Sequence, residues 1–250
     1  MTNIPKTIII AIGENSGKLI PNIVLNNIMD ISTINIDSKT KPFIDEKFIS
    51  QNQDKITSIF SSTDIVFVIS YNLNKTSLDI LNMATNNNVL AIPILIGTDE
   101  HKENYSSYLT LIIDTADNKK LPVLISQAIN AITQTIIGNE EIDIILDYSD
   151  LKEVMSIPGM AITNTVEYTG KSAGIESMKA LINLELSIQN AKGALICFGV
   201  NPDFPIAELF GSIEILKNPV NEDTNIIFST STDSSLASDY VKTTLILTGL

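Results

Sequence analysis

The sequence predicts an α/β protein with a Rossmann-type, doubly wound parallel sheet, then a central helix, then a mixed-sheet α/β domain. Three observations support this. Short β-branched runs alternate with helical spacing in the first half of the 250 residues. One long apolar helix follows, and the strand and helix patterns after it come in a different order. We expect the three parts to be residues 1–118, 119–139 and 140–250.

Turn residues bound each of the runs that we assign to strands and helices in the first domain. Strands are predicted at Thr7–Gly13, Thr33–Asp37, Asp64–Ser70, Val89–Ile96 and Leu109–Asp114. Helices are predicted at Lys18–Met29 and Asp54–Phe60, and another begins near Thr76 or Ser77, either of which could cap it.

The central helix is predicted at Leu121–Ile137, apolar over a wide arc and ended by Gly138 and Asn139. The domain after it should hold a mixed sheet and two helices. Its strands are expected at Gly159–Tyr168, Ala194–Val200, Asn225–Ser231 and Thr243–Thr248, and its helices at Gly174–Leu186 and Pro205–Leu216.

Composition excludes several classes of function. With 29 acidic and 16 basic residues, the net charge of −13 argues against general binding to nucleic acid or to anionic membranes. No signal peptide precedes the first strand, and no apolar stretch is long enough to span a bilayer, so we expect a cytoplasmic protein without direct membrane insertion. Cys197 is the only cysteine, and His101 lies in a polar loop, so no disulfide and no metal site are predicted.

The turn Gly13–Lys18 joins the first strand to a helix, where backbone N–H groups can bind phosphate. Its glycine spacing matches neither common phosphate-binding motif, and Glu14 adds a negative charge where a phosphate would sit. An ordinary strand–helix turn is the alternative. Lys75 and Thr76 could also touch an anion at a helix start, although capping of that helix explains Thr76 and Ser77 equally well.

Asp147 and Asp150 lie three residues apart where an apolar segment gives way to a helix. Two carboxylates near a shared site can polarise an attacking water. Alternatively, Asp150 is the N-cap of the helix and Glu153 completes a capping box, which accounts less well for Asp147.

The segment 144–160 (IILDYSDLKEVMSIPGM) and most of residues 191–250 resemble the second half of the bacterial tubulin relative FtsZ. This resemblance implies a tubulin-type fold. In that family an Asn-x-Asp-x-x-Asp "synergy loop" enters the GTP pocket of the next subunit and completes its GTPase site. Asp147 and Asp150 match its two acidic positions, whereas Ile145 replaces its asparagine. The resemblance therefore implies that these carboxylates act on a neighbouring subunit.

The first half resembles the family less closely. The family's first glycine-rich turn is reduced here to Gly13 and Gly17, and its GGGTGTG signature is replaced by Tyr71–Ser77, which contains no glycine. Without glycine, the backbone cannot readily wrap a triphosphate. By this resemblance, the residues that remain of a nucleotide pocket are Gly13, Gly17, Asn35, Asp37, Lys75 and Thr76. We expect no cofactor, and GTP only if the pocket has been remodelled.

The resulting expectation is a divergent, shortened FtsZ-like protein that has lost GTP binding and hydrolysis. It would be a structural or regulatory partner in cell division or cytoskeletal filaments, and could cap a filament through the synergy loop. Its partner would be FtsZ or itself, through longitudinal tubulin-type contacts. Two alternatives stay open: a GTPase that polymerises with a remodelled pocket, and a filament or dimer scaffold that needs no nucleotide. From the resemblance we expect a protein that ends with the family's globular body and lacks the tail that recruits division partners.

Overall fold

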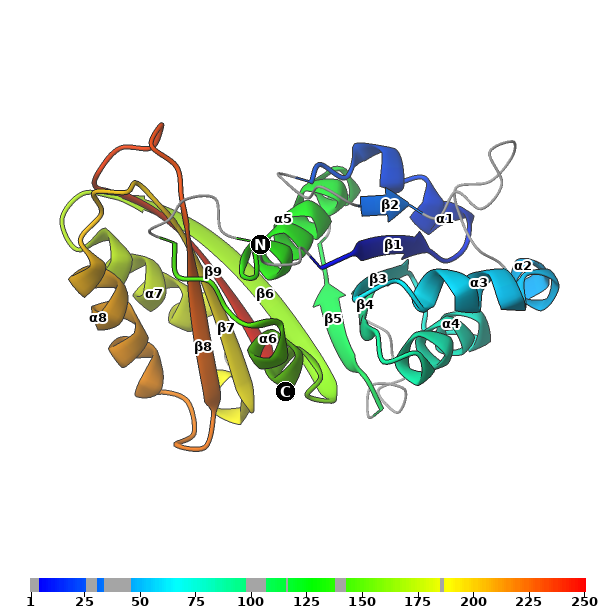
Figure 1. Cartoon of the computed structure of the whole chain (residues 1–250). Coiled ribbons are helices and arrows are strands. Elements are labelled where there is room, and N and C mark those ends of the chain that lie inside the picture. The colour runs from blue at the N-terminus through cyan, green and yellow to red at the C-terminus, as the bar shows by residue number, and fades with distance from the viewer. Residues whose placement is uncertain are drawn as a thin grey trace. The chain divides into compact units, whose positions relative to one another are not determined.

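The computed structural model describes residues 5–25, 31–33, 46–97, 107–115, 117–137, 143–184 and 187–250. The chain divides into two compact units, Met1–Asn130 and Ala131–Leu250, and the division falls inside helix α5 (Leu121–Gln134). Each unit contributes its own set of strands (Figure 1) and has an apolar core of its own.

The N-terminal unit is built on a parallel sheet, as the sequence predicts. Its strands lie in the order β2 (Ile31–Thr33), β1 (Thr7–Ala11), β3 (Ile65–Ser70), β4 (Leu90–Ile96) and β5 (Leu109–Ile113). Every residue of β1 and β3 is buried. Strands covered on both faces read as continuous apolar runs, which is why the sequence reveals them clearly.

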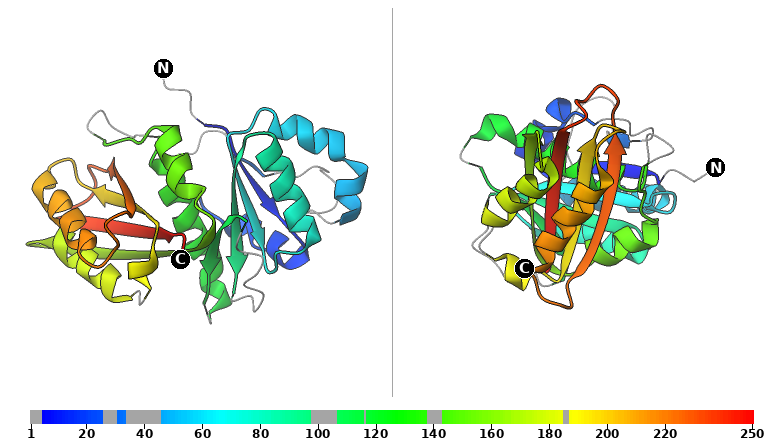
Figure 2. Two further views of the ribbon diagram at one scale, coloured as in Figure 1. Left: turned by 90° about the horizontal axis from the view of Figure 1, so that it is seen from below. Right: turned by 90° about the vertical axis from the view of Figure 1, so that its left-hand side faces the viewer.

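Helices α2 (Glu46–Gln51), α3 (Gln53–Phe60) and α4 (Lys75–Asn86) cover one face of this sheet, and the first turns of α5 lie on the other side (Figures 1 and 2). A short 3-10 turn, η3 (Asn118–Lys120), leads into α5. The core beneath α2, α3 and α4 includes Ile8, Ile10, Ile49, Ile56, Phe60, Val66, Val68, Ile80, Leu81 and Ala84.

The helix predicted at Lys18–Met29 is wrong over the residues that the structure describes. In its place stand a four-residue helix, α1 (Glu14–Gly17), and a 3-10 turn, η1 (Ile20–Asn22), after which the chain is extended at Ile23. Pro21 explains the difference, because proline lacks an N–H and cannot continue an α-helical ladder. The strand predicted at Thr33–Asp37 meets β2 only at Thr33, and residues 34–37 lie outside the described residues.

The C-terminal unit has the predicted mixed sheet, and α7 (Ala173–Leu184) and α8 (Ile206–Lys217) are the two helices predicted to accompany it. Its strands lie in the order β6 (Gly159–Thr169), β9 (Tyr240–Thr248), β7 (Gly193–Val200) and β8 (Asn225–Thr232). β9 is antiparallel to β6 and β7, and β7 is parallel to β8.

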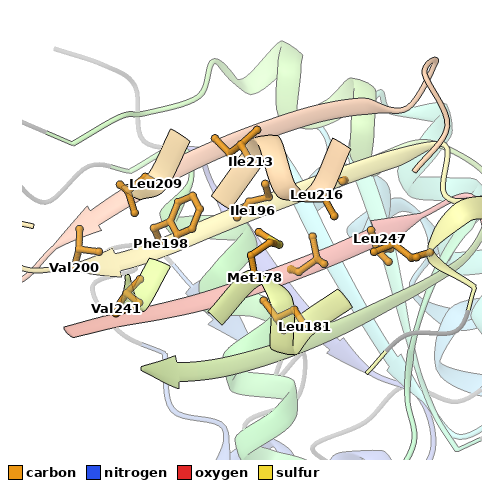
Figure 3. Close-up of a cluster of buried hydrophobic side chains, with 14 of the residues drawn as sticks. Met178, Leu181, Ile196, Phe198, Val200, Leu209, Ile213, Leu216, Val241 and Leu247 are labelled. Carbon is orange, nitrogen blue, oxygen red and sulfur yellow. The ribbon is translucent and has the colours of Figure 1, made fainter. Parts of the chain in front are cut away.

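Helices α7 and α8 lie side by side over one face of this sheet, as the right-hand view of Figure 2 shows. A 3-10 turn, η4 (Ile188–Asn190), follows α7. Figure 3 shows the side chains that fill the layer between the helices and the sheet, among them Met178, Leu181, Ile196, Phe198, Leu209, Ile213, Leu216 and Leu247.

Helix α6 (Tyr148–Met155) packs against β7 and β8 and buries Leu151, Val154 and Met155. The packing is close at Gly193 in β7. A Cβ built there would lie 2.5 Å from Thr248 Oγ1 and 2.7 Å from Ile157 Cδ1. Glycine at this position therefore lets α6 and its following turn approach the strand. No helix within the described parts of the chain combines the length and the apolar character that crossing a bilayer requires.

Candidate functional sites

The first candidate site lies at the carboxyl ends of β1 and β3, which are neighbouring parallel strands. Gly13 follows β1 with a φ of 80°, and open space lies where its Cβ would be. Gly13 precedes α1, a helix of four residues, which is too short to offer phosphate a strong helix dipole. Glu14 forms an exposed ion pair with Lys18, with Oε1 2.9 Å from Nζ, so its carboxylate is held at this turn. Glu14 thereby offsets the positive charge of Lys18, which would otherwise favour phosphate binding.

The turn after β3 is capped by its own side chains. Asn74 is the N-cap of α4, and its Oδ1 accepts the Ser77 backbone N–H at 3.0 Å and lies 3.3 Å from Ser77 Oγ. The predicted cap at Thr76 or Ser77 is therefore wrong: both residues lie inside the helix and are buried. Among the described non-glycine residues, positive φ occurs only at Asn88 and Ser172, so Tyr71–Ser77 forms no glycine-like cradle.

Lys75, the one basic residue of this turn, is already paired. Its Nζ lies 3.0 Å from Glu46 Oε1. This hydrogen bond raises the pKa of Lys75, and the charges of Glu46 and Asp79 raise it further. The lysine stays charged, but acidic neighbours surround it. Of the other predicted pocket residues, Gly17 is buried, whereas Asn35 and Asp37 lie outside the described residues.

The second candidate site is the segment Asp143–Asp150, which hydrogen bonds attach to the rest of the C-terminal unit. The Ile144 N–H donates to Thr230 Oγ1 at 2.7 Å, and the Thr230 N–H donates to the Ile144 carbonyl at 3.0 Å. Asp143 Oδ1 accepts the Thr232 N–H at 2.8 Å. The Leu146 N–H donates to the Thr135 carbonyl at 2.7 Å. The sheet and the chain just after α5 thereby position residues 143–146 of the loop.

Asp147 is the N-cap of α6 by backbone position, but its carboxylate makes no capping hydrogen bond. Asp150 lies in the first turn of the helix, so the interpretation of Asp150 as an N-cap is wrong. Glu153 completes no capping box, since its Oε1 accepts instead from Asn225 Nδ2 at 3.0 Å. Both aspartates are exposed. Because both carboxylates are exposed, they can bind a cation, a donor or a water outside the loop.

Sequence reasoning missed the residues that hold this loop. Thr230 and Thr232 are inconspicuous in a β-branched strand, and Asp143 stands in an irregular stretch. The alternation of threonine with serine along β8 (residues 229–232) is the only signal, and it marks many exposed strands equally well. The part of the chain that the structure describes contains no cluster of three or more histidine, cysteine or acidic residues suited to a metal ion.

Parts of the chain are similar in sequence to known proteins. Residues 159–250 match the family model of the FtsZ family, C-terminal domain. The cell division protein FtsZ of Helicobacter pylori is 26% identical over 108 residues, which are 42% of this chain and 28% of that protein. Cell division protein FtsZ 1 of Archaeoglobus fulgidus is 28% identical over 161 residues, which are 63% of this chain and 42% of that protein. The chain therefore matches less than half the length of these relatives.

Solved structures match over nearly the whole chain. The empty FtsZ dimer of M. jannaschii has a TM-score of 0.78 at 16% identity, covering 98% of this chain and 88% of that one. A GTPgS-bound CetZ2 protofilament from Haloferax volcanii has a TM-score of 0.60 at 12% identity, covering 97% and 92%. At these identities the likeness concerns the fold.

With its parallel α/β unit, a helix at the boundary and a mixed C-terminal sheet, the chain has the fold of the FtsZ structures. In sequence, residues 159–250 are similar to the C-terminal domain of the FtsZ family, and parts of the chain are similar to the cell division protein FtsZ.

Proposed function

We propose that this protein is a structural or regulatory partner of FtsZ-type filaments that binds no nucleotide of its own. The single observation that carries the proposal is the contrast between its two candidate sites. Asp147 and Asp150 are exposed on a loop that Thr230 and Thr232 hold in place. In the turn after β3, where a nucleotide would be expected, Asn74 caps helix α4 and Lys75 is paired with Glu46.

The loss of only one of two complementary ends suggests how the partner acts. FtsZ-type subunits assemble by inserting the synergy loop of one subunit into the nucleotide pocket of the next. A chain with a sound loop and a poor pocket can join a filament at one face only. It would then terminate growth there, which is the activity of a capping protein.

The experiment mixes the purified protein with an FtsZ that polymerises and hydrolyses GTP, and measures light scattering and phosphate release. We expect equimolar protein to change both. Asp147→Asn combined with Asp150→Asn should abolish the effect, whereas Asp54→Asn, an exposed aspartate on α3, should retain it. No effect of the unaltered protein at equimolar ratio would exclude a capping role.

Two other functions predict different results. A GTPase with a remodelled pocket would bind GTP in a calorimetric titration, and its specific activity would rise with protein concentration as subunits complete each other's sites. A scaffold that needs no nucleotide would form filaments or dimers alone. Sedimentation of the pure protein without GTP distinguishes this scaffold from a capping partner, which should stay unassembled.

A further inference from the structure

The aspartate loop (residues 143–150) presents an apolar side chain beside its first exposed carboxylate. Exposure alternates along the loop: Ile144 and Leu146 are half-buried, whereas Ile145 and Asp147 are exposed. Such alternation is typical of an extended segment, in which side chains two residues apart point to the same side. The backbone of Asp147 is itself extended, with φ −67° and ψ 145°. Ile145, which is 49% exposed, therefore shares the outward side of the loop with Asp147.

Hydrogen bonds on either side of Ile145 keep its side chain outward. The backbone of Ile144 is bonded to Thr230 through both its N–H and its carbonyl, and the Leu146 N–H donates to the Thr135 carbonyl at 2.7 Å. These bonds attach the backbone before and after Ile145 to the rest of the C-terminal unit. To turn the isoleucine inward, the loop would have to break at least one of them. Its exposure is thus set by the fold.

Isoleucine differs from the two aspartates in what it can do with water. The carboxylates of Asp147 and Asp150 accept hydrogen bonds, whereas the side chain of Ile145 has neither a donor nor an acceptor. A water enclosed between two surfaces is held by about two to four polar partners, and apolar cavities stay dry. A pocket that receives this loop therefore meets hydrocarbon on the same side as the first carboxylate.

We propose that Ile145 makes the aspartate loop a plug, which excludes the attacking water from the nucleotide pocket that the loop enters. The docking itself rests on the proposed function, and the plug adds what docking does to the partner. The step that it blocks is the attack of a water oxygen on the γ-phosphorus, which would release phosphate and leave a nucleoside diphosphate. The covered FtsZ-type subunit keeps its triphosphate intact, so capping preserves the triphosphate form of the terminal subunit.

The test mixes an FtsZ that hydrolyses GTP with saturating amounts of the unaltered chain, of Ile145→Asn or of Ile145→Val. Asparagine is similar in size to isoleucine but supplies a donor and an acceptor, whereas valine stays apolar. Fluorescence anisotropy of labelled FtsZ measures the affinity of each protein. Phosphate release per covered subunit, together with the GTP that stays bound, measures hydrolysis.

We expect the unaltered chain and Ile145→Val to bind and to leave the bound GTP intact. Ile145→Asn should bind about tenfold more weakly, because less apolar surface is buried. At saturation it should nevertheless release phosphate about tenfold faster, because the loop now admits a water that the carboxylates can polarise. Leu184→Asn, at a 59% exposed site on α7, is the matched control and should behave like the unaltered chain.

The outcomes distinguish this inference from the proposed function. Without any binding of the unaltered chain to FtsZ, both fail. Binding that speeds phosphate release from the covered subunit would leave the docking intact and refute the plug. Equal phosphate release with the unaltered chain and with both Ile145 variants would refute it as well. Ile145→Thr, which keeps the branched shape and adds one hydroxyl, replaces Ile145→Asn if that variant binds too weakly to reach saturation, and thermal melting confirms that each variant is folded.

Discussion

Thr230 and Ile144 are joined by two reciprocal hydrogen bonds, one to the Thr230 hydroxyl and one from its backbone N–H. The pair fixes the start of the aspartate loop to the edge strand of the C-terminal sheet. Position and exposure of Asp147 and Asp150 therefore depend on a strand about eighty residues further along the chain. This contact couples the geometry of the loop to the sheet. A conservative substitution of Thr230 removes the hydroxyl group and can change the loop without disrupting the sheet.

Thr230→Val should lower the free energy of unfolding by about 1 kcal/mol, because the Ile144 N–H loses its acceptor. Amides of residues 143–147 should also exchange faster with solvent. Thr232→Val is the control, since buried Thr232 Oγ1 has no hydrogen-bond partner among the described residues. It should be neutral or slightly stabilising. Chemical denaturation and hydrogen exchange measure both, and equal effects would mean that the hydroxyl does not hold the loop.

Asn74→Ala should destabilise the protein by about 1 kcal/mol, because the first turn of α4 loses its side-chain cap. Asn74→Ser should keep most of the stability, since serine is also a good N-cap residue. Urea denaturation followed by circular dichroism measures the difference. If alanine and serine proved equivalent, the cap would contribute nothing to stability.

Gly193→Ala should cost about 1–3 kcal/mol, because the added methyl group would be forced against Thr248 and Ile157. Gly199→Ala, on the same strand, is the matched control. There a Cβ would lie 3.5 Å from the nearest atom, Lys242 Cβ, which is an ordinary contact. We expect little or no loss at 199. Melting temperatures compare the two variants, and a similar loss in both would refute tight packing at 193.

Cys197 should be slow to react with iodoacetamide at pH 8 in the folded protein. The residue is partly exposed, but burial of its thiol raises the pKa to about 12. The unfolded thiol ionises near its ordinary pKa of about 8.5. Above that pH the unfolded state releases a proton that the folded state keeps, so stability falls from about pH 8.5 towards 12.

Cys197→Ser removes this ionisation and should lose less stability over the same alkaline range. Tyr240, whose pKa burial and Glu167 raise to about 12, contributes the same trend to both proteins. The difference between their pH–stability curves therefore isolates the thiol. Identical curves, or rapid alkylation at pH 8, would show that the thiol is not buried in solution.

Strands and sheet types could be predicted because burial on both faces leaves a continuous apolar signal, as at Ile65–Ser70. Sequence rules for helix N-caps failed where several neighbouring residues could each have been the cap. Asn74, Thr76 and Ser77 all suit a cap, and only tertiary packing, which buries the last two, decides in favour of Asn74. Helix α2 went unpredicted because its six residues carry too little periodicity.

In the aspartate loop, too, local features could be proposed from the sequence, whereas long-range contacts could not. Asp147 and Asp150 could be proposed from the sequence because their spacing is local and resembles the acidic positions of a known motif. Their supports, Thr230 and Thr232, act from a distant strand and through a backbone N–H that any residue would present. A sequence contains no local trace of such long-range contacts.

Helix α5 has a consequence for anyone who wishes to build hybrids of this protein with its relatives. The boundary between the two units falls after Asn130, inside this helix. The next residue, Ala131, already contacts the C-terminal sheet, because its carbonyl accepts a hydrogen bond from Cys197 Sγ at 3.2 Å. A hybrid joined at this boundary would combine two halves of one helix from different proteins. Recombinants should therefore inherit Leu121–Gln134 whole, and a joint placed ahead of Asn118 meets that condition.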